Sequence, residues 1–148
     1  LTSPYFMPTD EILTALKTAA LRGVDVRVLV PGRSDSFIPR LSTESYIEEM
    51  LEANIRVYLY TNGFIHSKTL VVDDEIASIG SANMDFRSLE TNFEINAVIY
   101  NYEQAKQMAE TFYNDLNNSQ ELNYSQWRKR PFGKRLLASL MRLLSPLM

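Results

Sequence analysis

The sequence predicts an α/β fold, because patterns typical of helices alternate with patterns typical of strands. Residues 9–23 show the spacing and end signals of a helix, and the strand-like residues 24–30 follow directly. A second helical pattern, from residue 43 to about residue 53, is followed by another strand-like run over residues 55–60. The chain has 148 residues, of which 45% are apolar, and is therefore long enough for one domain with a sizeable core.

The first helix has clear signals at both ends. Thr9 is a good N-cap, and the two acidic residues that follow it suit the positive end of the helix dipole. Gly23 fits the position just after a helix, where the backbone is commonly left-handed. Pro31 and Gly32 end the next strand. We expect residues 32–42 to form a loop, which is either a solvated connection or a rim that helps to hold substrate.

The middle of the chain is predicted to contain a β-hairpin. The Asn-Gly pair at residues 62–63 is a strong turn signal before it. Residues 67–72 and 75–79 are predicted to be short strands joined by a tight turn at residues 73–74. The elements expected after the hairpin are a strand and an amphipathic helix, over residues 93–100 and about 103–118. The side chains of this helix expected to face inward are Ala105, Met108, Ala109, Phe112, Tyr113 and Leu116.

The C-terminal part of the chain differs from the rest in charge. From Leu122 onward there is no acidic residue, and the cations are Arg128, Lys129, Arg130, Lys134, Arg135 and Arg142. The preceding residues carry 9 cations and 18 acids. The acidic body argues against nucleic acid as a partner, and the basic tail indicates a local anionic partner.

The tail also has the pattern of an amphipathic helix over residues 133–144, with Pro146 ending it. This helix either lies in a membrane interface, with Lys134, Arg135 and Arg142 attracted to anionic lipid, or docks on the domain. The two arrangements can coexist. No apolar run reaches the roughly 18 to 20 residues needed to cross a bilayer.

Two further features limit what the chain contains. It has no cysteine, so disulfides and thiolate metal sites are excluded. It begins at Leu1 rather than at a methionine, and its first residues read as the end of a strand that runs into a loop. We therefore expect it to be a fragment of a longer protein.

Residues 66–94 hold the side chains best suited to chemistry on a phosphate. His66 is the only histidine, and Lys68 lies two residues later, on the same face of an extended strand. The imidazole can act as nucleophile or as acid and base near neutral pH, and the lysine can balance charge on phosphoryl oxygens. Ser81 and Asn83 can donate hydrogen bonds to the same oxygens. Glu94 is the candidate carboxylate that fixes the tautomer of the histidine.

Each of these residues is weak evidence alone, but their joint spacing is specific. The spacing resembles the HKD signature of the phospholipase D superfamily with no departure: His66-x-Lys68-x4-Asp73-x6-Gly80-Ser81-x-Asn83. Further stretches are similar to the C-terminal half of bacterial cardiolipin synthases, and extend the resemblance over essentially the whole chain: residues 5–8, 23–27, 31–35, 80–88, 92–94 and 143–147.

The resemblance implies an α/β/α sandwich around a mixed sheet, as one half of a pseudo-two-fold pair. It implies that Lys68 and Asn83 bind phosphate beside His66, that Ser81 lines the site, and that Glu94 hydrogen-bonds the histidine. Asp73 completes the catalytic set of His66, Lys68, Asp73 and Glu94 as the motif's aspartate, although its role in the family is structural. No metal and no cofactor are implied.

Two HKD motifs form one active site in this superfamily, and this chain carries one. The implied reaction joins two phosphatidylglycerol molecules into cardiolipin with release of glycerol, through a phosphohistidine. His66 is then the acid and base, with the nucleophile on the other half, or the two roles are reversed. The alternatives are a hydrolytic phospholipase, a nuclease, or a catalytically silent fragment that associates with membrane.

The resemblance also implies partners and organisation. The partners are phosphatidylglycerol, a membrane surface, and either the N-terminal HKD half of the same protein or a second copy of the chain. The full-length protein is expected at the bacterial cell membrane. We expect residues 1–120 to form the catalytic domain and residues 121–148 a basic amphipathic tail, and the isolated fragment can be inactive.

Overall fold

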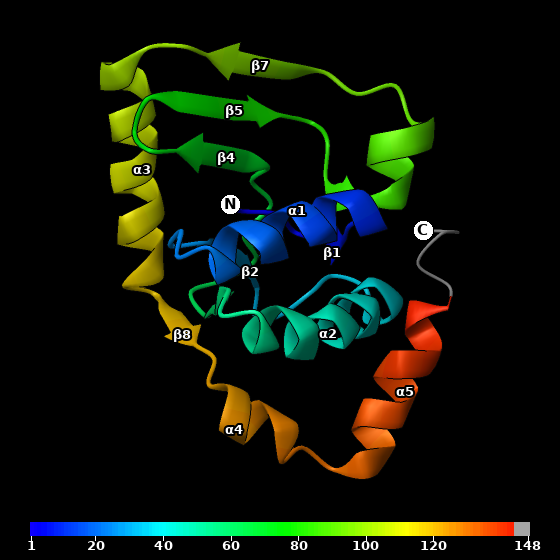
Figure 1. Ribbon diagram of the computed structural model, residues 1–148. Helices are drawn as coiled ribbons and strands as arrows, with labels where there is room; N and C mark the ends of the chain where they lie inside the picture. Colours follow the sequence, from blue (N-terminus) through cyan, green and yellow to red (C-terminus); the bar gives the residue numbers. More distant parts are fainter. Residues whose placement is uncertain (144–148) are drawn as a thin grey trace.

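A computed structural model describes residues 1–143. Its helices and strands alternate along the chain, as predicted (Figure 1): β1 (Phe6–Met7), α1 (Asp10–Leu21), β2 (Arg27–Pro31), α2 (Phe37–Glu52), β3 (Arg56–Tyr60), β4 (Thr69–Val72), β5 (Ile76–Gly80), β6 (Met84–Asp85), the π-helix η1 (Arg87–Thr91), β7 (Asn96–Ile99), α3 (Tyr102–Leu116), β8 (Ser119–Glu121), α4 (Tyr124–Arg128) and α5 (Phe132–Arg142). The expected helix stop at Pro146 and the last part of the resemblance, residues 144–147, lie outside the described residues.

The strands form a mixed sheet, which confirms the predicted fold class. β2 pairs in parallel with β3, which pairs antiparallel with β8. β4, β5 and β7 form an antiparallel ladder. Thr2 bridges to Leu29 of β2 in parallel and to Thr69 of β4 antiparallel. Residues 1–3 therefore act as a central strand that joins the two ladders.

Helices cover both faces of this sheet. Successive side chains of a strand point to opposite faces, so β2 contributes to two cores. Val28 and Val30 lie in a buried cluster with residues of α1 and α2, including Leu13 and Ile47. Leu29, on the other face, packs in a cluster that includes residues of α3. The result is the three-layered α/β/α arrangement expected from the resemblance.

The second helix is longer than predicted. α2 begins at Phe37 rather than near residue 43, so the loop before it spans only residues 32–36. Pro39 is the residue that made a helix before residue 43 look unfavourable in the sequence. It lies in the first turn of α2, where a missing N–H leaves no intrahelical hydrogen bond unmade. Arg40, expected in the loop, is a helical residue that pairs with Glu44 at 3.2 Å.

The predicted hairpin is confirmed. β4 and β5 pair antiparallel from Thr69 opposite Ile79 to Val72 opposite Ile76. Asp73 and Asp74, between the strands, have φ angles of 53° and 57°, in the left-handed region that tight hairpin turns require. The strand predicted at residues 93–100 is shorter than expected, because regular pairing with β5 begins only at Asn96.

The C-terminal helix docks on the domain through its charges. α5 packs on α2, with Arg135 paired to Glu48 at 3.0 Å and Arg142 paired to Glu49 at 2.9 Å. Ala138 is buried in the contact. Both guanidinium groups are directed at acidic side chains of α2, which is the docked arrangement, and contact of Arg135 and Arg142 with a membrane stays a prediction.

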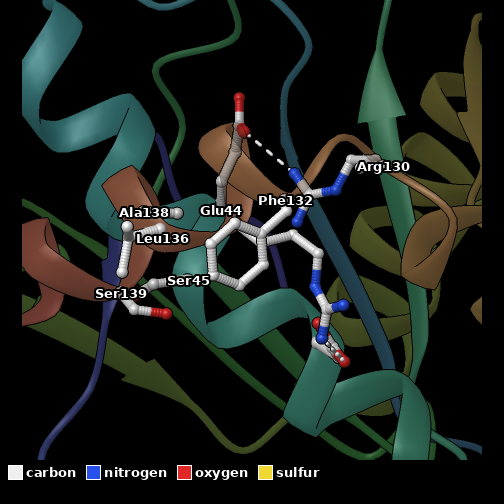
Figure 2. Close-up of a pocket in the computed structure, with 9 residues that line it drawn as sticks. Glu44, Ser45, Arg130, Phe132, Leu136, Ala138 and Ser139 are labelled. Carbon is white, nitrogen blue, oxygen red and sulfur yellow. Dashed lines mark hydrogen bonds and ion pairs between the residues drawn. The ribbon is translucent and has the colours of Figure 1, made fainter.

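Large apolar side chains of the α5 region face outward instead. They are Phe132, Leu136, Leu137, Leu140 and Leu143, with exposed fractions from 39% to 77%. A cavity of about 210 Å³ lies between α2 and α5, and Phe132 and Leu136 belong to its lining. Figure 2 shows Phe132 beside the Arg130–Glu44 ion pair. Among the described residues, no helix combines the length and the hydropathy that crossing a bilayer requires.

Candidate active site

The histidine of the motif lies in the segment that leads into β4. The side chain of His66 is exposed, and its ring contacts two aromatic rings. The Tyr5 ring lies edge-on at 6.2 Å between centroids, and the Phe64 ring is tilted at 5.3 Å. Within residues 1–143 the imidazole has no hydrogen-bond partner, so both ring nitrogens are accessible to a ligand.

Lys68 lies two residues after His66, directly before β4, and its side chain lies near the backbone of His66. Its backbone carbonyl accepts a hydrogen bond from Gly80 at 3.2 Å, which aligns it with β5. Its ammonium Nζ donates to the backbone carbonyl of His66 at 2.9 Å. Partial burial lowers the pKa of Lys68, and the carboxylates of Glu94 and Asp85 oppose that shift. The lysine is thus a partly buried cation beside the backbone of the histidine, under the influence of two carboxylates.

Ser81 and Glu94 meet at the end of β5. The Ser81 hydroxyl donates a short hydrogen bond to Glu94 Oε2, and it accepts from the Ile95 N–H at 3.0 Å. The hydrogen bond from Ser81 lowers the pKa of Glu94. Gly80 permits this approach, because a Cβ there would lie 2.2 Å from the Ile95 carbonyl oxygen.

The expected hydrogen bond between Glu94 and His66 is absent from the described residues. Glu94 accepts from Ser81 and, at 3.3 Å, from Asn92. The carboxylate lies in the cluster as predicted, but it holds the serine and is electrostatically coupled to Lys68 rather than to the imidazole. Its place in catalysis remains a prediction, to be tested in the complete enzyme.

Asn83 lies just before β6, and Asp85 lies within this strand. The Oδ1 atom of Asn83 is buried and has no hydrogen-bond partner in the described structure. Asp85 is also buried, and its Oδ1 accepts the backbone N–H of Ser88 at 2.8 Å. A buried polar atom that lacks a hydrogen-bond partner destabilises the fold. The unpaired Oδ1 of Asn83 therefore indicates a position where a ligand can supply the missing hydrogen bond.

Asp73 does not join this cluster. It lies in the hairpin turn beyond Val72, at the opposite end of β4 from Lys68. At about 3.3 Å per residue, the five positions between Lys68 and Asp73 correspond to roughly 16 Å along the strand. The assignment of Asp73 to the catalytic set is therefore wrong for this structure, whereas its structural role in the turn is consistent with the left-handed backbone.

Residues far from the motif in sequence also reach the site, and reasoning from the motif alone missed them. The Tyr5 hydroxyl donates to both carboxylate oxygens of Asp35 at 2.9 Å, which holds the tyrosine ring beside His66. Burial and the Asp35 hydrogen bond raise the pKa of Tyr5 to about 12. The loop before α2 thus supports the tyrosine beside His66, and a role of this loop in holding substrate stays a prediction. In the sequence, Tyr5 and Asp35 stood out only as members of residues 5–8 and 31–35, two of the stretches that carry the family resemblance.

The cluster contains types of side chain that phosphoryl chemistry uses. It supplies an exposed imidazole, a cation and hydrogen-bonding side chains around one region. Attack on phosphorus and protonation of the leaving alcohol require two separate groups. Within residues 1–143, no group of three or more His, Asp or Glu side chains is placed to hold a metal ion.

Comparison with known proteins gives a consistent relationship. Residues 1–116 match the family model described as cardiolipin synthase, PLD-like domain. The chain is 51% identical over 146 residues to a cardiolipin synthase of Alkalihalophilus pseudofirmus, and covers 29% of that protein and 99% of itself. It is 49% identical over 146 residues to a cardiolipin synthase of Geobacillus thermodenitrificans, with the same two coverages. The chain thus spans less than a third of the length of these curated relatives.

Solved structures share the fold at low sequence identity. The phospholipase D family member Nuc from Salmonella typhimurium superposes with a TM-score of 0.70 at 24% identity, over 82% of this chain and 79% of Nuc. A phosphatidylserine synthase from Haemophilus influenzae superposes with a TM-score of 0.76 at 17% identity. That superposition covers 99% of this chain and 40% of the synthase. The fold is therefore one that occurs as a module within a longer chain.

Proposed function

The chain belongs to the family of cardiolipin synthase PLD-like domains, and from this premise we propose that it is one half of the catalytic unit of a phosphatidyltransferase. The observation that carries the proposal is the clustering of His66, Lys68, Ser81 and Glu94 at one end of the β4–β5 hairpin. The motif spacing predicted this cluster. The high identity to cardiolipin synthases over nearly the whole chain supports the same activity.

The proposed reaction moves a phosphatidyl group between two molecules of phosphatidylglycerol. In the first step a histidine nitrogen attacks phosphorus, the bond from phosphorus to the glycerol headgroup oxygen breaks, and a second histidine protonates the departing glycerol. In the second step that histidine accepts a proton from a hydroxyl of the other phosphatidylglycerol. This hydroxyl oxygen attacks phosphorus, the bond from phosphorus to the histidine nitrogen breaks, and cardiolipin and the free nucleophilic histidine result.

The chain's own residues have defined parts in this scheme. His66 is one of the two histidines, and we assign it the acid and base role, with the nucleophile on the other half. Lys68 stabilises negative charge on the phosphoryl oxygens, and Asn83 binds the same phosphate. Ser81, held by Glu94, lines that site. The second histidine comes from the rest of the longer protein or from a second copy of the chain.

A direct product assay tests this function. The full-length enzyme is incubated with phosphatidylglycerol, and the lipids are separated by chromatography. Transfer yields cardiolipin and free glycerol in equal amounts. Phosphatidic acid as the main lipid product would identify a hydrolytic phospholipase, and the absence of any turnover would favour a silent membrane-associating domain. A nuclease is disfavoured because the body of the chain is acidic.

We expect Glu94→Gln to lower kcat by roughly 10- to 100-fold with little change in KM, because an amide holds Ser81 less strongly and gives less support to the charge of Lys68. The measurement is steady-state transfer by the full-length enzyme. Glu75→Gln is the matched control, since Glu75 is an exposed glutamate in the hairpin turn at the other end of β4. Equal rates for both variants would remove Glu94 from the site.

The exposed apolar side chains of α5 favour contact of this helix with a membrane surface. Its large apolar side chains are exposed, while its arginines are held by α2. Lys134 is exposed at the border of this apolar surface, in the position of a residue that meets lipid headgroups. We propose that the exposed leucines, with Lys134, hold the enzyme at the bacterial cell membrane beside its lipid substrate.

The double variant Leu136→Ser, Leu140→Ser is expected to reduce binding to phosphatidylglycerol vesicles by roughly tenfold or more, since two half-exposed leucines lose their transfer into the lipid. Lys134→Ala is expected to have a smaller effect, which fades at high salt. Vesicle sedimentation measures both. Undiminished binding of the double variant would show that this side of α5 does not contact lipid.

A further inference from the structure

The cavity between α2 and α5 shares no lining residue with the motif cluster around His66. Residues of both helices line it, together with Arg130 from the segment between α4 and α5 (Figure 2). Its volume is about 210 Å³. Such a volume corresponds to roughly seven water molecules at about 30 Å³ each, so the cavity can hold a small polar group of a ligand.

Two guanidinium groups meet at this cavity. Arg130 Nη1 donates to Glu44 at 3.0 Å, and Arg135 Nη2 donates to a glutamate one turn further along α2 at 3.0 Å. Burial lowers the pKa of Arg130, and the carboxylates of Glu44 and Glu48 oppose this shift. The positive charge of Arg135 lowers that pKa further, so the two guanidinium groups lie close enough to repel each other. An anion that contacts both would offset this repulsion.

Polar groups of the lining remain without a hydrogen-bond partner within residues 1–143. The Nε–H of Arg135 is buried and unpaired. Glu48 accepts from Arg135 through Oε1, which leaves its Oε2 unpaired. The hydroxyl of Ser139 is also unpaired. A ligand in the cavity can therefore find donors and an acceptor that the protein itself does not use, and it would satisfy a buried donor.

The charges of the lining define the class of ligand. Two arginines and two glutamates line the cavity, so it is close to neutral and offers spare hydrogen-bonding groups rather than spare charge. The carboxylates would repel a doubly charged phosphate monoester. A phosphodiester carries a single negative charge and can accept from Arg135, while a hydroxyl on its headgroup can donate to Glu48. The lining therefore fits a phosphodiester with a hydroxylated headgroup.

Apolar side chains border the same cavity. Phe132 and Leu136 belong to its lining, and both are exposed. Leu140 lies one turn further along α5 and is exposed as well. These side chains can contact the glycerol ester and the acyl chains of a lipid whose phosphate lies between α2 and α5. A polar interior with an apolar border suits an amphiphilic ligand rather than a free ion.

We propose that this cavity is a second lipid site, which binds the phosphate and the headgroup hydroxyls of phosphatidylglycerol at the membrane surface, apart from the motif cluster. The choice of a lipid as the source of the phosphodiester rests on the proposed contact of α5 with the membrane. The guanidinium groups of Arg130 and Arg135 bind the phosphate together with the Ser139 hydroxyl, and Glu48 accepts from the headgroup. Because the ligand contacts both helices, it holds α5 docked on α2 while the exposed leucines of α5 contact the membrane.

Hydrogen exchange of the full-length enzyme, measured by mass spectrometry on peptides that contain α5, tests this proposal. The probe is dihexanoyl phosphatidylglycerol, a water-soluble form of the lipid. We expect it to slow exchange in α5 by roughly fivefold or more at saturation. In Arg135→Lys, half-maximal protection should need at least about tenfold more lipid, because an ammonium keeps the charge opposite Glu48 but lacks the Nε–H and the forked geometry of a guanidinium.

Three further variants make the test specific. Arg142→Lys is the matched control, since Arg142 pairs with Glu49 of α2 at 2.9 Å but does not line the cavity. It should need the same lipid concentration as the unmodified enzyme. Lys68→Met should also leave the protection of α5 unchanged, which separates the cavity from the motif cluster. Ser139→Ala changes only an exposed side chain and should raise the required concentration by roughly threefold.

Three outcomes would overturn the proposal. One is the same lipid dependence in Arg135→Lys and Arg142→Lys. Another is loss of the protection in Lys68→Met, which would place the lipid at the motif cluster. The third is equal protection by inorganic phosphate at the same concentration, which would make free phosphate the ligand. Transfer activity is measured in the same preparations. Protection of α5 in an unmodified enzyme that shows no transfer would contradict the proposed function and would still support the second site.

Discussion

Replacing His66 by alanine in the full-length enzyme is expected to abolish cardiolipin formation, with a loss of roughly 10³- to 10⁶-fold in kcat. The physical reason is that the proposed mechanism needs two histidines with different roles, and His66 is the only one that these 148 residues supply. The fold is expected to survive. The side chain is exposed and contacts only the edges and faces of Tyr5 and Phe64, so stability should change by no more than about 0.5 kcal/mol.

The measurement is transfer from labelled phosphatidylglycerol, together with Tm for each variant. Ser67→Ala is the matched control, because Ser67 is the exposed neighbour whose side chain points to the other side of the extended segment. Activity within tenfold of the unmodified enzyme in His66→Ala would refute the assignment of the site.

The same variant distinguishes the two possible roles of His66. A phosphatidyl ester with p-nitrophenol as its leaving group needs no protonation when it departs. If His66 is the acid, His66→Ala should release p-nitrophenolate at close to the normal rate in a single turnover. If His66 is the nucleophile, the variant should release none. We expect release, in agreement with the acid and base role.

The second large effect is expected for Lys68→Met, with a fall in kcat/KM of roughly 10²- to 10³-fold. The methionine keeps the length and apolar stem of the side chain but removes the only lysine in residues 66–94. The cation is half-buried and lies close to Glu94 and Asp85, so its removal leaves two carboxylates that repel an incoming phosphate. Lys68→Arg should restore little activity, because a planar guanidinium does not reproduce a compact ammonium.

Steady-state transfer and competition by inorganic phosphate together measure this effect. The phosphate inhibition constant should rise along with the loss of activity, which a purely structural role of Lys68 would not produce. Lys106→Met serves as the control, because Lys106 lies on α3 and stacks on Tyr102 away from the cluster. A kcat/KM within about threefold of normal in Lys68→Met would exclude Lys68 as a phosphate ligand.

The two variants also address the incompleteness of the half-site. Each removes a group from one half, while the proposed nucleophile lies on the other. If two chains of this kind assemble one site, adding His66→Ala chains to unmodified chains should lower the activity of the unmodified chains. The loss should be proportional to the number of dimers that contain one chain of each kind. If the second motif lies in the same longer protein, the two populations should act independently.

Much of the fold could be predicted from local patterns. The hairpin over β4 and β5 was predicted because its turn residues, Asp73 and Asp74, belong to a type that tolerates the left-handed backbone that the turn requires. Gly23, with a φ of 94°, was predicted from the end of the α1 pattern. The start of α2 at Phe37 was not predicted, because Pro39 favours a loop in the sequence as much as it favours the first turn of a helix.

Part of the candidate site was also predictable, because the motif is local in sequence. The spacing placed Lys68, Ser81 and Glu94 near one another, and the structure brings them together. The predicted hydrogen bond between Glu94 and His66 is not present among the described residues, where Glu94 accepts from Ser81. A choice between two nearby partners depends on side-chain geometry that spacing does not contain.

The sequence by itself determined the α/β class, the family and the catalytic motif, because turn chemistry, periodicity and motif spacing are properties of neighbouring residues. The tertiary structure alone decided which distant groups meet. It placed Tyr5 against Asp35, 30 positions away, and turned the arginines of α5 toward α2 so that its leucines face outward. It also made residues 1–3 a central strand. Such contacts depend on how residues from all parts of the chain are buried and paired by charge in the folded state, and a local stretch of sequence does not contain that information.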